Sequence, residues 1–198
     1  MFLNSAHSKA ADRQRSGWSS KTGCIIFMKI ETKNLILISG NIKILSSAIK
    51  GADFLSDNLN ASVSEPWTEF GLAPIEYSLT KIFQNESENG WWTYFPIHKD
   101  DKKLIGSCGY KGSPTSEGNV EIGYEVISEY RQKGLGTEIA KGLVSNAFKF
   151  DNVKMIIAHT LPSENASTNI LKRLGFDKVS EIIDPEDGLI WRWELNRK

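Results

Sequence analysis

The feature that most constrains the fold is a junction in the second half of the chain, where a strand pattern meets a helix pattern across a short turn. Residues 119–127 form a β-prone segment, and residues 134–150 repeat apolar residues at helical spacing, with Leu135, Ile139 and Leu143 in one stripe. Two glycines, Gly134 and Gly136, open the helical part. A strand that leads directly into an amphipathic helix predicts a mixed α/β sheet covered by helices.

The remaining patterns fit the same architecture. Short apolar and aromatic runs alternate with turn-forming residues in the middle of the chain, which predicts an antiparallel meander before the junction. Residues 51–72 are rich in Asn, Asp, Ser and Gly, and we expect loop and short helix there. We expect strands at 30–39, 91–97, 103–110, 119–127, 153–161, 176–183 and 189–195, and helices at 42–49, 74–85, 134–150 and 163–174.

The composition narrows the class of protein. A chain of 198 residues with 40% hydrophobic and 24% charged residues is typical of one globular domain. Lys+Arg and Asp+Glu are 24 each, which argues against a dedicated duplex-DNA binder, and no apolar run is long enough to span a membrane. Cys24 and Cys108 are expected to be free thiols in a reducing cytosol. The histidines, His7, His98 and His159, lack metal-ligand spacing, so we expect no metal.

The first 27 residues differ from the rest of the chain. They are rich in serine and carry four basic residues and one acid, a net charge of +3 against −3 for the remainder. The apolar run at 24–28 is short and follows a lysine, which does not fit a signal peptide. We predict that residues 1–27 are a disordered extension or a non-native start, and that residues 28–198 form a single domain.

The junction also has the composition of an anion-binding site. The first N–H groups of a helix are unpaired and carry partial positive charge, and glycine lets an anion approach them closely. Arg131 and Lys133 add positive charge. The third glycine of a dinucleotide fingerprint is absent, because residue 139 is isoleucine, and no Walker-type Lys-Ser/Thr pair follows. On these residues alone, a phosphate site and a tight strand–helix turn are equally good interpretations.

Three motifs in order give the chain a resemblance to the GNAT acyltransferases. The Arg-x-x-Gly-x-Gly at residues 131–136 is similar to that family's pyrophosphate signature, and residues 165–176, from Asn-Ala-Ser to Leu-Gly-Phe, resemble its next motif. The Glu-Ile-Gly-Tyr at 121–124 resembles the branch that contains the N-terminal acetyltransferases of ribosomal proteins. The resemblance implies one mostly antiparallel sheet of about six or seven strands with helices on both faces. It also implies that the parallel neighbours 119–127 and 153–161 splay apart.

What the resemblance implies for ligands is acetyl-CoA bound in that splay. The backbone of Val126 and Ile127 would pair with the pantetheine arm, and an N–H there would polarise the thioester carbonyl. Asn165 would hold the arm or cap its own helix. The residues implied around the pyrophosphate are Arg131, Gln132, Lys133, Gly134, Leu135, Gly136 and Thr137.

Direct attack by an amine on a thioester needs a base for the amine proton and an acid for the departing thiolate. The base candidates are Glu121, on the cofactor strand, and His159, near the end of the next strand, with Glu125 as a third. An ion-paired strand carboxylate and a hydrogen-bonded core histidine are the ordinary structural interpretations of the first two. Many family members place a tyrosine as the acid where this chain has Leu171, and Ser167 is the remaining hydroxyl in the motif.

We therefore interpret the chain as an acetyl-CoA-dependent N-acetyltransferase whose acceptor is a primary amine, either a protein N-terminus or a small amine. The alternative is a non-catalytic acyl-CoA-binding module of the same fold, supported by the missing tyrosine. A third possibility is an interaction protein with a vestigial pocket. We expect a cytoplasmic monomer or homodimer with no nucleic-acid or membrane partner. No motif in residues 51–90, the expected acceptor loops, identifies the amine.

Overall fold

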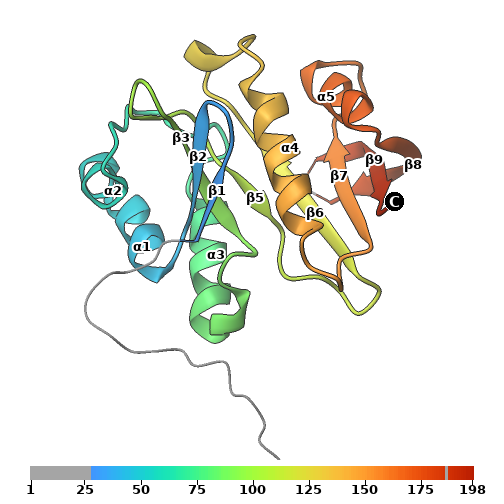
Figure 1. The fold of residues 1–198 in the computed structure, drawn as a ribbon, viewed down its shortest axis with the longest axis horizontal. Helices are drawn as coiled ribbons and strands as arrows, with labels where there is room; N and C mark the ends of the chain where they lie inside the picture. The colour runs from blue at the N-terminus through green and yellow to red at the C-terminus, as the bar shows by residue number, and fades with distance from the viewer. Residues whose placement is uncertain (1–27, 186) are drawn as a thin grey trace, which may run out of the picture.

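A nine-stranded sheet forms the centre of the computed structural model, which describes residues 28–185 and 187–198 (Figure 1). The predicted extension, residues 1–27, lies outside the described residues. The strand order is β1-β2-β3-β5-β6-β7-β9-β8, with β4 paired to β3. The strands are β1 Lys29–Glu31, β2 Leu35–Ser39, β3 Thr93–His98, β4 Lys103–Leu104, β5 Cys108–Tyr110, β6 Asn119–Tyr124, β7 Met155–Thr160, β8 Asp177–Asp184 and β9 Gly188–Asn196.

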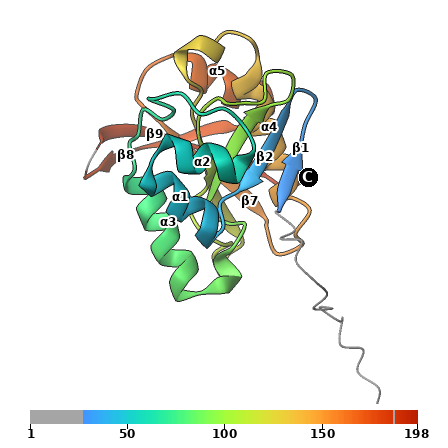
Figure 2. The same ribbon diagram turned by 90° about the vertical axis from the view of Figure 1, so that its left-hand side faces the viewer.

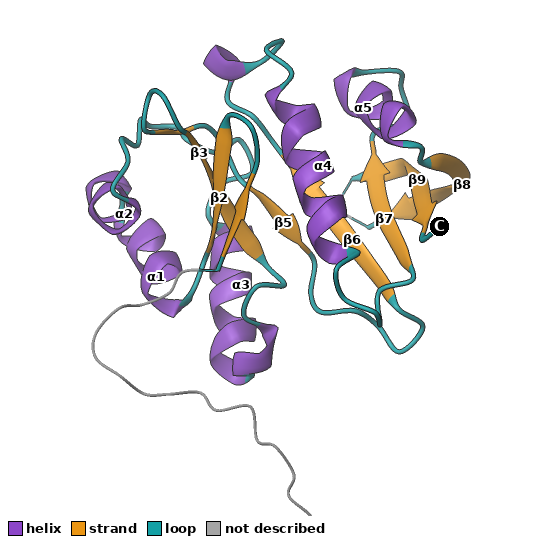
Figure 3. Cartoon of the chain, in the orientation of Figure 1, coloured by secondary structure: helices purple, strands orange, loops and turns teal. Residues whose placement is uncertain are grey.

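Helices cover both faces of this sheet, as the sequence predicts. Figure 2 shows α1, α2 and α3 grouped together, and Figure 3 shows α4 lying across the strands beside α5. The first group packs on a core that includes Phe95 and Ile97, whereas α4 and α5 pack on a second core that includes Val120 and Ile156. The helices are α1 Ile42–Lys50, α2 Ala52–Leu59, α3 Ala73–Gln84, α4 Leu135–Ala147 and α5 Ala166–Leu174, with short 3-10 turns η1 Glu86–Glu88 and η2 Ser128–Tyr130.

The predicted mixed α/β fold is confirmed, but two predicted strands are each divided. Residues 29–39 form the hairpin of β1 and β2 instead of one strand, and residues 103–110 form β4 and β5 on either side of Gly106. Gly106 has φ 146°, and a Cβ there would lie 2.4 Å from the carbonyl oxygen of Glu125. This close approach of two backbones interrupts the strand, and only glycine fits it.

The one parallel pair among the described strands is β6 with β7, and the two part after a short common stretch. They pair over Asn119–Glu121 and Met155–Ile157. Beyond that point the β6 chain stays with the other side of the sheet, because the N–H of Glu125 donates to Ser107 O at 2.8 Å. In contrast, β7 continues beside β9 as far as Thr160. The predicted splay therefore opens between the end of β6 and the end of β7.

No helix in the described part of the chain is both long and apolar enough to cross a bilayer.

Candidate active site

The turn before α4 presents a row of unpaired backbone donors. Among the described residues, no hydrogen bond uses the N–H of any residue from 132 to 137. Gln132 and Gly134 both have positive φ, 60° and 77°, and Gly134 is the N-cap of α4 without a side-chain cap. Consecutive free N–H groups at a helix N-terminus, where the helix dipole is positive, suit an anion such as a phosphate.

The two glycines of the turn are required for different structural reasons. A Cβ on Gly134 would meet no atom within 4 Å, so this residue leaves open space above the N–H groups. A Cβ on Gly136 would lie 3.2 Å from Ile170 Cδ1 and 3.9 Å from Val126 Cγ2. Gly136 therefore lets α4 pack closely against α5 and the end of the β6 chain, while Gly134 supplies the backbone conformation.

The basic residues of the turn differ in their present partners. The Nε of Arg131 donates to Val126 O at 2.8 Å, and its Nη2 lies 2.5 Å from Glu69 Oε1. The ammonium of Lys133 lies 4.7 Å from the centre of the Tyr130 ring. Arg131 thus ties the turn before α4 to the loop before α3, and Lys133 adds positive charge next to the free N–H groups.

The backbone N–H groups of Val126 and Ile127 point to opposite sides of the chain. Ile127 N–H donates to Ile105 O at 2.9 Å, on the β5 side, so it is already used within the sheet. Backbone groups alternate along an extended chain, so the N–H of Val126 faces the splay, and no described residue accepts from it. Of the two residues implied for the pantetheine arm, Val126 is therefore the one with a free backbone donor on the correct side.

The two predicted base candidates lie in direct contact. His159 Nδ1 is 2.9 Å from Glu121 Oε1, and the same carboxylate oxygen lies 2.5 Å from Lys111 Nζ. Val120 and Ile156 of β6 and β7 point into the core under α4, so Glu121 and His159 point to the opposite face. Their side chains are 22% and 18% exposed, although the Nε2 atom of His159 is itself buried.

A pair of hydroxyl groups lies on the α5 side of the same opening. Tyr124 Oη and Ser167 Oγ are 3.1 Å apart, and Tyr124 packs against the core under α4 and α5. Burial raises the pKa of Tyr124, and its hydrogen bond to Ser167 opposes part of that rise. Tyr124 belongs to the Glu-Ile-Gly-Tyr motif, but the sequence interpretation gave it no role. Leu171, at the position of the missing tyrosine, is fully buried.

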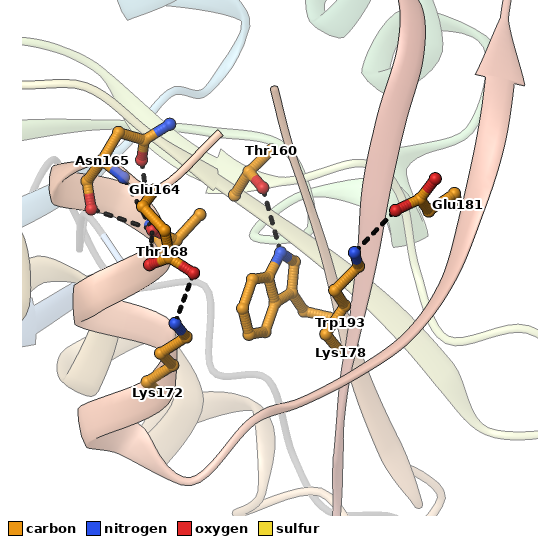
Figure 4. A network of polar contacts seen from close by, with 8 residues as sticks. All are labelled: Thr160, Glu164, Asn165, Thr168, Lys172, Lys178, Glu181 and Trp193. Carbon is orange, nitrogen blue, oxygen red and sulfur yellow. Dashed lines mark hydrogen bonds and ion pairs between the residues drawn. The ribbon is translucent and has the colours of Figure 1, made fainter. Parts of the chain in front are cut away.

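Asn165 has a clear structural role, shown with its neighbours in Figure 4. Its Oδ1 accepts from Thr168 N at 3.0 Å, while Thr168 Oγ1 accepts from Asn165 N at 2.9 Å, which together form a capping box on α5. Glu164 also accepts from Lys172 at 2.6 Å. The capping role was one of the two interpretations of Asn165, and the capping bonds use its Oδ1.

Glu125, the third base candidate, is occupied by other contacts. It is 8% exposed and accepts hydrogen bonds from Thr68 Oγ1 at 2.5 Å, Glu69 N at 2.8 Å and Ser107 Oγ at 2.6 Å. A carboxylate with three donors is an anchor. It fixes the loop before α3 against the β6 chain, next to the Glu69–Arg131 ion pair.

Comparison with known proteins is consistent with this geometry. Residues 54–177 match the family described as "Acetyltransferase (GNAT) domain". The "Uncharacterized N-acetyltransferase YjdG" of Bacillus subtilis is 28% identical over 149 residues, which cover 74% of this chain and 88% of that protein.

Two solved structures share the fold at low sequence identity. The ribosomal-protein-S5-alanine acetyltransferase of Vibrio fischeri has a TM-score of 0.62 at 17% identity and covers 85% of this chain and 96% of its own. RimL, a ribosomal L7/L12 alpha-N-protein acetyltransferase solved with coenzyme A, has a TM-score of 0.62 at 11% identity, covering 85% of this chain and 98% of its own.

Proposed function

Because the chain belongs to the GNAT acetyltransferase family, we propose that it transfers the acetyl group of acetyl-CoA directly to a primary amine. The observation that carries the proposal is the row of unpaired N–H groups from residue 132 to residue 137, next to the opening between β6 and β7. The row of N–H groups suits the pyrophosphate of acetyl-CoA. The opening between β6 and β7 suits its extended pantetheine arm, whose thioester end would lie between these two strands.

The chain's own residues divide the remaining work between those faces. The Val126 N–H points to the side where the thioester would lie, and donates to its carbonyl oxygen as the tetrahedral oxyanion forms. On the face of Glu121 and His159, this pair takes the proton of the attacking amine. On the other face, the Tyr124–Ser167 hydroxyl pair supplies a proton to the departing thiolate.

We propose that the acceptor is a protein N-terminus or a small amine. The names of the solved structures support an amine, since the Vibrio fischeri protein and RimL are described as acetylating ribosomal proteins. The loop between α2 and α3 is the candidate acceptor-binding segment, since Glu125 and Arg131 hold it beside the cofactor turn. We also propose that residues 28–198 act as one domain.

The experiment is an acetyl-transfer assay with the purified full chain. Acetyl-CoA is offered with a panel of acceptors: peptides with free alanine or serine N-termini, a polyamine and free amino acids. CoA release is followed with a thiol reagent, and the product by mass spectrometry. We expect at least one amine to gain an acetyl group in step with CoA release. Binding of acetyl-CoA without turnover of any amine would instead support the non-catalytic acyl-CoA-binding module.

A further inference from the structure

The Glu121–His159 contact has one unsatisfied member. His159 Nδ1 is hydrogen-bonded to Glu121 Oε1, but His159 Nε2 is buried and has no hydrogen-bond partner among the described residues. Leaving a buried polar atom unpaired costs free energy, and native structures keep few such atoms. An atom that remains unpaired is explained by a bound ligand, a water molecule or a functional role.

The partners of Glu121 decide which ring nitrogen carries the proton. A carboxylate in an ion pair accepts hydrogen bonds and donates none, and Glu121 Oε1 forms such a pair with Lys111 Nζ at 2.5 Å. The proton in the 2.9 Å contact therefore belongs to His159 Nδ1. In the neutral imidazole this leaves a lone pair on Nε2, fixed in direction because the carboxylate holds the ring. A protonated Nε2 would instead be a buried cationic donor with nothing to bond.

We infer that His159 Nε2 is the atom that takes the amine proton, and that Glu121 is a positioning residue that holds the imidazole through Nδ1. The inference rests on the proposed acetyltransferase function and assigns roles within its base pair. In the transfer, the amine nitrogen bonds to the acetyl carbon, and the C–S bond breaks with its electron pair leaving on sulfur. The amine proton passes to Nε2, directly or through one water. The Tyr124–Ser167 pair protonates the thiolate, and water then restores both groups.

The charged groups around His159 are balanced. Arg192 is its cross-strand neighbour on β9, and the guanidinium donates to Glu194 at 2.8 Å. Lys111 in turn faces Glu121. Two opposite-charge pairs thus flank the imidazole.

Two variants and a matched control separate this assignment from direct base catalysis by Glu121. His159→Gln removes the base, and we expect kcat/KM to fall by at least about 100-fold while acetyl-CoA affinity is kept. Glu121→Gln keeps an acceptor for Nδ1–H but loses the charge, so we expect a loss of about 10-fold or less. The control, Glu181→Gln, removes a β8 carboxylate paired with Lys178 and leaves both quantities unchanged.

The opposite pattern would overturn the assignment. If Glu121→Gln abolishes turnover, while His159→Gln keeps most of the activity, then Glu121 is the base. Wild-type protein that turns over none of the amines refutes the proposed function and, with it, the catalytic role of Nε2.

A measurement on the resting protein tests the pairing without any turnover. Nitrogen-15 NMR of the full chain distinguishes the two tautomers of a neutral histidine, and we expect neutral His159 to carry its proton on Nδ1. The third variant, Glu121→Leu, removes the acceptor, so the preference for that tautomer should weaken. A wild-type His159 with its proton on Nε2 would refute the inference, whatever the activity, because Nε2 would then have no lone pair to offer.

Discussion

Replacing Gly134 by glutamate tests the placement of the pyrophosphate. Gly134 is the N-cap of α4 with φ 77°, and its Cβ position is open, so a glutamate side chain extends freely over the N–H groups of the turn. Two effects follow from one substitution. The positive φ costs a non-glycine residue about 1–2 kcal/mol of stability. The added carboxylate also repels any anion bound at the turn.

The electrostatic effect can be bounded. The repulsion between a carboxylate and a diphosphate of about two negative charges, about 5 Å apart, is about 1.7 kcal/mol at the dielectric constant of water and about 7 kcal/mol at an effective constant of about 20. The smaller value weakens binding about 15-fold. We therefore expect Gly134→Glu to raise the Kd for acetyl-CoA by about 15-fold or more in a calorimetric titration.

The chain offers a matched control for backbone strain and charge. Gly188, in the hairpin between β8 and β9, has φ 72° and no atom within 4 Å of its Cβ position. Gly188→Glu carries the same strain and the same charge away from the turn, so it should lose similar thermal stability but keep acetyl-CoA affinity. If Gly134→Glu binds within about threefold of Gly188→Glu, the pyrophosphate does not lie on this turn.

Three further predictions concern stability. Glu138 accepts hydrogen bonds from Thr32 and Asn34. Burial raises the pKa of Glu138, but these hydrogen bonds together lower it by more, so its net pKa shift is downward. Glu138→Gln should cost about 1–3 kcal/mol in urea unfolding at neutral pH. A carboxyl group whose pKa is lower in the folded state stabilises the fold at pH values above its unfolded-state pKa. The cost of Glu138→Gln should therefore shrink as the pH falls below 4.5, and a cost that grows there contradicts the reasoning. Gly106→Ala should lower stability by about 1–3 kcal/mol in thermal unfolding, since its Cβ would lie 2.4 Å from a carbonyl oxygen, and an unchanged Tm would show that the backbone adapts. Asn165→Ala removes the side-chain acceptor of the capping box on α5 and should cost about 1 kcal/mol in urea unfolding, whereas no loss would mean that solvent replaces the cap.

Patterns that are local in the chain were sufficient for most of the fold. The helical stripe at residues 134–150 predicts α4, and Gly175 ends α5 in the left-handed conformation expected of a C-cap glycine. The division of residues 103–110 could not be predicted in the same way. It depends on the approach of Gly106 to Glu125, the residue that follows β6, and periodicity carries no information on such contacts.

The candidate site follows the same division. The turn at residues 131–137 is contiguous in the chain, so its glycines and basic residues could be recognised from the sequence, where they favour an anion site and a tight strand–helix turn equally. The sequence also named Glu121 and His159, but as separate candidates, because their contact depends on the register of two parallel strands. The Tyr124–Ser167 pair joins a strand to a helix, and was missed for the same reason.

We propose that this chain forms a complex with acetyl-CoA. Calorimetric titration of the purified full chain with acetyl-CoA, in the absence of any amine, measures the formation of that complex without any turnover. We predict saturable binding with about one site per chain. No detectable heat or saturation up to about millimolar acetyl-CoA would contradict the account, because the catalytic and the non-catalytic interpretations both require this complex.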